Sequence, residues 1–189
     1  MNFSDLLSFS ATAAVLTFAL NQLVSIGKEI YNRSEKRKYQ GLRLALKLER
    51  FAIDCAGLIH DQIAFINSHG STGSPFSTLP TFELPEVEWN LFPLHLTNTV
   101  LSFENDIRDA NASISFAIDY DSADDGTEEP SEQAGLCGYR ASQLADLLRR
   151  KYDLGSPEAA LHGWDRVSFL KDLHDKKLSH YHSMRGIQQ

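Results

Sequence analysis

The sequence predicts an all-α protein, with an N-terminal transmembrane helix followed by an antiparallel four-helix bundle. The first observation is a run of 22 uncharged residues from Leu6 to Gly27. The second is a helical period of apolar residues through most of the remaining chain. The third is the scarcity of proline, with 6 in 189 residues, several of them between Pro75 and Pro93. A hydrophobic fraction of 42% is ordinary for a globular protein.

These patterns divide the chain into three parts and two notable loops. The parts are a transmembrane anchor at 1–27, a basic juxtamembrane helix at 28–43 and a cytoplasmic helical bundle at 44–185. The bundle contains a long loop at 69–92 and an acidic loop at 119–132.

The uncharged run is long enough to cross a bilayer. As a helix rising ~1.5 Å per residue it spans roughly 33 Å, against a hydrocarbon core of ~30 Å. A signal peptide fits poorly because no Lys or Arg precedes the run. By the positive-inside rule, the charges that follow place the N-terminus outside and the bundle in the cytoplasm, and they suit an anionic lipid surface. The basic residues that follow the run are Lys28, Arg33, Lys36, Arg37 and Lys38.

Small and polar residues recur in this run at steps of three and four. Ser10, Ala14, Thr17, Asn21 and Ser25 therefore share one helical face. Such residues let membrane helices approach and form hydrogen bonds, and an amide facing acyl chains is costly. We expect this face to contact other copies of the chain, either as a dry interface or as the lining of a pore.

The polar third of the run also allows a second interpretation. The chain can be a soluble oligomeric subunit of a larger complex that buries the N-terminal helix against a partner protein.

Charge favours protein over nucleic acid as the partner in either case. Residues 28–50 carry eight Lys or Arg against three Glu, whereas residues 51–189 carry ten against twenty-one Asp or Glu. An acidic body lacks the clustered cations that bind phosphates.

Four helices are predicted for the bundle from apolar spacing. The first contains Leu44, Leu48 and Cys55, and the loop after it should run back along the bundle with Phe76, Phe82, Leu84 and Trp89 as anchors. The second is expected at 94–118 and the third at 131–152. The fourth should begin near Ser156, which is followed by Pro157.

The acidic and histidine-rich segments match metal sites poorly, and a solvated acidic loop is the favoured interpretation of residues 119–132. With Asp121 at position 1 of a calcium loop, Ala123 removes a ligand at position 3 and Pro130 occupies position 10. Among the C-terminal histidines, His180 and His182 are spaced i,i+2 and so do not share a helical face. No second clear histidine pair completes a zinc site. We expect no metal and no cofactor. The histidines concerned are His162, His174, His180 and His182.

No nucleophile motif or phosphate loop occurs, so the sequence predicts a non-enzymatic protein. A weaker possibility is a hydrolase or metal enzyme with a site assembled from His60, Asp61 and His95, if they meet across the core. Cys55 and Cys137 are expected to be free and structural, because two distant thiols do not form a disulfide framework.

Overall fold

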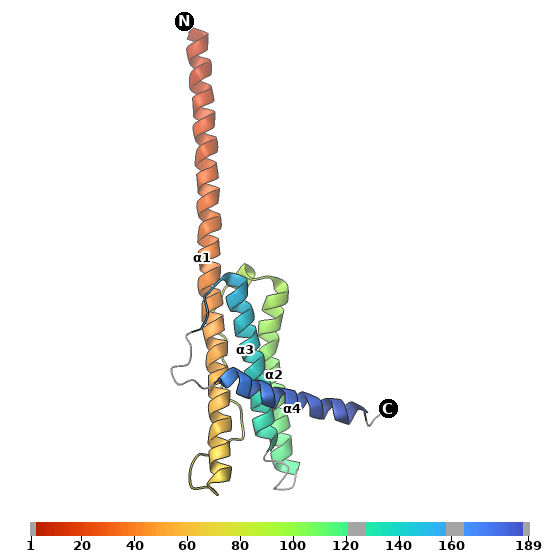
Figure 1. Ribbon diagram of the computed structural model, residues 1–189. Coiled ribbons are helices and arrows are strands. Elements are labelled where there is room, and N and C mark those ends of the chain that lie inside the picture. The colour runs from red at the N-terminus through yellow and green to blue at the C-terminus, as the bar shows by residue number, and fades with distance from the viewer. Residues whose placement is uncertain (1–2, 121–127, 158–164, 187–189) are drawn as a thin grey trace. The chain divides into compact units, whose positions relative to one another are not determined.

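A computed structural model describes residues 3–120, 128–157 and 165–186. Within these ranges, the side chains of residues 3–17, 19, 180 and 183–186 are not described. The described residues are helical or irregular, without a strand, which confirms the all-α prediction (Figure 1). The α-helices are α1 (Phe3–Asn67), α2 (Leu94–Tyr120), α3 (Glu128–Tyr152) and α4 (Arg166–Gly186), and a 3-10 turn lies at Trp89–Leu91.

Helix α1 is 65 residues long and belongs to two structural units. One unit contains residues 1–39 and the other residues 40–189. The helix extends without interruption because no proline occurs before Pro75. At Gly41 a Cβ would lie 3.0 Å from Cδ2 of Tyr152, so this glycine permits close approach of α1 and α3.

The core of the second unit lies between α2, α3 and the part of α1 after residue 40. Three aromatic rings meet edge to face at its centre: Phe51, Phe82 and Phe103 have centroids 5.2–5.5 Å apart. The largest fully buried side chains around them come from all three helices. They include Leu44, Leu48, Ile59, Leu96, Ile114 and Leu148.

The segment between α1 and α2 runs back along α1, as the sequence predicts. Near the C-terminal end of α1, a Cβ on Gly73 would clash with the backbone of Asp61 and Phe65. Farther along the segment, the Glu88 amide donates to Oε1 of Gln40 at 2.8 Å. Gln40 precedes Asp61 by about twenty residues in α1. Phe82 packs against the core between these points.

This return makes the part of α1 after residue 40 parallel to α2, which corrects the prediction of a uniformly antiparallel bundle. Helix α2 begins beside the start of this part of α1, where Phe92 meets Tyr152 edge to face with ring centroids 5.7 Å apart. Helix α3 is antiparallel to both (Figure 1). Arg149 of α3 pairs with Glu49 of α1, and Arg140 pairs with Asp106 of α2 at 3.1 Å.

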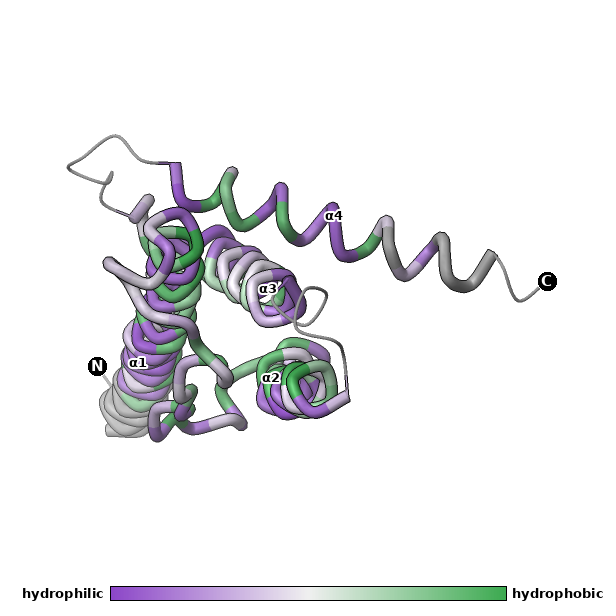
Figure 2. The backbone as a smooth tube through the Cα atoms, turned by 90° about the horizontal axis from the view of Figure 1, so that it is seen from below, coloured by the Kyte–Doolittle hydropathy of each residue, from purple (hydrophilic) through white to green (hydrophobic). Residues whose placement is uncertain are grey.

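Helix α4 lies across α3 instead of completing the predicted set of four antiparallel helices. Figure 2 views α2 and α3 nearly end-on, whereas α4 runs lengthwise across α3. Asp165 caps its N-terminus by accepting a hydrogen bond from the Ser168 amide at 3.0 Å. The predicted start, with Ser156 as the cap and Pro157 as the first residue, is wrong, because these two residues are not helical and α4 begins at Arg166. Residues 158–164 lie outside the described residues.

No helix within the described part of the chain is long and apolar enough to cross a membrane.

Candidate interaction surface

Large apolar side chains of the first unit are exposed along α1. Phe18, Leu23 and Ile30 are each 66% exposed, which is far more than an ordinary buried helix face allows. They recur over about three turns and point in several directions around the helix axis. We call the described members of this set the α1 apolar surface. Its residues are Phe18, Leu20, Leu23, Val24, Ile26, Ile30 and Tyr31.

The predicted self-association face lies on the same helix. Because residues 3–67 are helical, the three-and-four spacing of this face places its members in one line along α1. Asn21 and Ser25 are exposed. The side chains of Ser10, Ala14 and Thr17 lie outside the described ones.

The predicted basic residues continue directly from the apolar surface on α1. Lys28, Arg33 and Lys36 are exposed, and Arg37 and Lys38 are half-buried. Lys38 forms an ion pair with Glu35, one turn away, at 3.7 Å. The side chains of this pair are 44% and 52% exposed, so the pair contributes little to stability.

The possible site of His60, Asp61 and His95 is not assembled, which corrects that hypothesis. His60 and Asp61 lie near the C-terminal end of α1, and their side chains are 71% and 57% exposed. His95 lies at the opposite end of the bundle, where Nε2 is 3.5 Å from Nζ of Lys151. From Gly41, which packs on Tyr152, to His60 the helix rises roughly 28 Å.

Metal-ligating side chains do not gather within the described part of the chain, where no group of three His, Cys, Asp or Glu could hold an ion. His174 instead packs on Tyr139, with ring centroids 4.8 Å apart. The side chain of His180, residue 162 and the tested calcium-loop positions Asp121 and Ala123 lie outside the described residues.

Cys55 and Cys137 are buried and unbridged, in agreement with the sequence prediction of free thiols. Burial raises the pKa of Cys137 to about 12, and it raises the pKa of Cys55 well above its ordinary value. A thiol that stays protonated is a poor nucleophile and a poor metal ligand. Both residues therefore act in the core as small apolar side chains.

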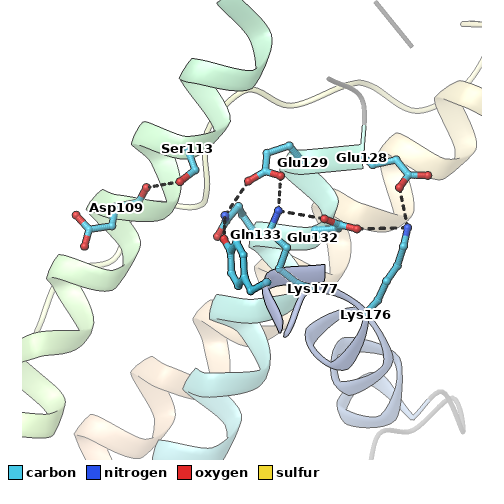
Figure 3. Close-up of polar contacts among 9 residues, drawn as sticks. Asp109, Ser113, Glu128, Glu129, Glu132, Gln133, Lys176 and Lys177 are labelled. Carbon is cyan, nitrogen blue, oxygen red and sulfur yellow. Dashed lines mark hydrogen bonds and ion pairs between the residues drawn. The ribbon is translucent and has the colours of Figure 1, made fainter. Parts of the chain in front are cut away.

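A polar network that the sequence reasoning missed joins α3 to α4 (Figure 3). Lys177 is 3% exposed and pairs with Glu129 and with Glu132, the latter at 3.1 Å. Lys176 pairs with Glu128 at 2.7 Å and with Glu132 at 3.3 Å. We call this network the α3–α4 clasp. Its residues are Glu128, Glu129, Glu132, Gln133, Lys176, Lys177 and Tyr181.

The hydrogen bonds of the clasp explain how a lysine can be buried there. Gln133 donates from Nε2 to Glu129 at 2.8 Å and to the Tyr181 hydroxyl at 3.0 Å. The Lys177 ammonium also lies 5.0 Å from the centre of the Tyr181 ring. The sequence signal was present in the run of acids at the start of α3 and the paired lysines, but nothing in it placed α4 across α3.

Comparison with known proteins gives no relative for this chain. No protein-family model, no curated protein and no solved structure matches it.

Proposed function

We propose that this is a non-enzymatic membrane-associated protein that inserts the N-terminal part of α1 into a lipid bilayer and self-associates there. The observation that carries the proposal is the α1 apolar surface, in which Phe18, Leu20 and Leu23 are each more than 60% exposed. A contiguous set of large apolar side chains in water is unfavourable by about 25 cal/mol per Å². It is expected to be covered.

The uncharged run from Leu6 to Gly27 and the basic residues after it favour a bilayer as the cover. The run precedes Lys28 and Arg33, so apolar and cationic parts follow each other along one helix. Acyl chains take up the first and anionic headgroups the second. In this proposal the helix spans the membrane once, with the N-terminus outside and the bundle in the cytoplasm, where it binds another protein.

Self-association is supported by the helical state of residues 3–67. It aligns Asn21 and Ser25, both exposed, with Ser10, Ala14 and Thr17. Amide and hydroxyl groups that would otherwise face lipid are satisfied by equivalent groups of a second copy.

The experiment is fractionation of the full-length chain expressed alone. We expect it to sediment with membranes, to resist extraction at alkaline pH, and to be labelled from outside when Phe3 is replaced by cysteine. Release into the soluble fraction would contradict the proposal. It would support the second candidate, a soluble subunit whose α1 apolar surface is covered by a partner protein, because that candidate explains the same exposed side chains without lipid.

A further inference from the structure

We propose that α4 is a detachable arm, held on α3 mainly by the charges of the α3–α4 clasp, and that it opens while α1, α2 and α3 remain folded. This inference concerns the second unit and is independent of membrane binding.

The apolar part of the α4 contact is small. Among the described residues, Leu170 is the one apolar side chain of α4 that is fully buried, and Phe169 and Leu173 are partly buried against the core. Helix α2, by contrast, buries seven residues: Leu96, Val100, Phe103, Ile107, Ala110, Ile114 and Ala117. Elements with few buried apolar contacts open at lower free energy than the core they cover.

The polar part of the contact is correspondingly large. Lys177 is buried between Glu129 and Glu132, so the closed state depends on their mutual charge compensation. The pair of Lys176 with Glu128 is exposed on both sides, at 54% and 67%, and is accessible to salt. Charge screening therefore weakens the closure of α4 more than it weakens the apolar core.

Two glycines of α3, Gly135 and Gly138, allow α4 to pack closely against α3. A Cβ on Gly138 would lie 3.0 Å from Cδ2 of Leu170 and 3.0 Å from Cβ of Cys55, and Gly135 lies directly under Leu173. Because one added Cβ would meet both side chains, Leu170 and Cys55 lie next to each other beside Gly138, and we infer that Leu170 helps to cover Cys55. When α4 leaves, this thiol loses its cover on the α4 side and reports the opening.

The test is hydrogen exchange of the full-length chain, with alkylation of Cys55 followed by peptide mapping. We expect Lys177→Met to lower the protection of α4 amides at least about tenfold, since loss of one partner leaves buried carboxylates uncompensated. Residues 44–59 and 100–114 should keep their protection, and Cys55 should react faster. Lys171→Met is the matched control, because Lys171 pairs with Asp175 within α4 itself.

A measurement on the unchanged chain guards against a variant that does not fold. Raising sodium chloride to ~1 M shortens the Debye length to ~3 Å, and we expect the protection of α4 to fall while that of α2 does not. Equal loss in α4 and α2, or no change in α4 with salt, would overturn the proposal. An unchanged α4 in a folded Lys177→Met variant would overturn it as well.

Discussion

Arg149 places a guanidinium group in the interface between α3 and α1. It forms a two-armed pair with Glu49, with one contact of 2.9 Å, and it donates to the Gly155 carbonyl at 3.1 Å. The hydrogen bond with Glu49 raises the pKa of Arg149, so the guanidinium group stays protonated. Arg149 therefore links α3 to α1 through Glu49. It also supplies a hydrogen-bond donor to a backbone carbonyl group just after the C-terminal end of α3.

Replacing Arg149 by methionine should cost about 3 kcal/mol of unfolding free energy, because it leaves the Glu49 carboxylate without its partner. Urea denaturation measures this. Arg150→Met is the matched control: Arg150 is 73% exposed and pairs with Asp146 one turn away, so its loss should cost less than about 0.5 kcal/mol. Equal losses in the two variants would show that the Glu49 pair does not stabilise the bundle.

Two helical glycines should respond to alanine with opposite signs. Gly57 has nothing within 4 Å of an added Cβ, so Gly57→Ala should stabilise the protein by about 0.5–1 kcal/mol through helix propensity. Gly138 contacts Cys55 and Leu170, so Gly138→Ala should destabilise it by about 1–3 kcal/mol through overpacking. Thermal denaturation of both variants checks the pair, and the same sign in both would contradict the described packing at Gly138.

At the scale of the element, Glu128 reports the clasp between α3 and α4. A hydrogen bond from Lys176 lowers the pKa of this carboxyl from 4.5. Because the pKa of Glu128 is lower in the folded state than in the unfolded state, the ionised carboxyl stabilises the fold when the pH is above the unfolded-state pKa. This stabilisation is lost as the pH falls through the folded-state pKa. NMR titration of Glu128 should give a midpoint below 4.5, which Lys176→Met returns toward that value. An unchanged midpoint in the variant would show that Lys176 does not pair with Glu128 in solution.

The sequence predicted the helices well and their directions less well. The period of Leu44, Leu48 and Cys55 was sufficient to predict the bundle part of α1, because buried positions recur along a helix face. The apolar residues of the 69–92 loop were sufficient to predict that it packs along the bundle. The crossing of α3 by α4 depends on Gly138 and Leu170 meeting in three dimensions. No local pattern contains that information.

At the scale of the whole molecule, the candidate surfaces differ in how far the sequence could define them. Most of the α1 apolar surface was visible in the sequence, because Phe18, Leu20 and Leu23 belong to the uncharged run from Leu6 to Gly27. The clasp was not, because charges such as Glu129 and Lys177 look like ordinary surface residues until α4 is placed on α3. The His60 and His95 hypothesis failed for a related reason, since their distance depends on the parallel course of α1 and α2.

Self-association should depend on the polar face of α1. Asn21→Leu is expected to reduce the oligomer to smaller species in detergent, because the amide is lost from the contact. Gln22→Leu is the matched control, since it makes the same change on a neighbouring residue that lies off this face. Chemical crosslinking with size-exclusion chromatography measures both, and an oligomer unchanged by Asn21→Leu would mean that the face does not hold the copies together.

The most direct test of the membrane proposal is sedimentation of the purified full-length chain with phosphatidylcholine and phosphatidylserine vesicles, followed by washing at alkaline pH. We predict that the unchanged chain and Leu94→Lys, whose leucine is exposed in the bundle at 84%, remain with the vesicles, whereas Leu20→Lys combined with Leu23→Lys does not. An unchanged chain that stays in the supernatant would contradict the account, as would equal binding by all three.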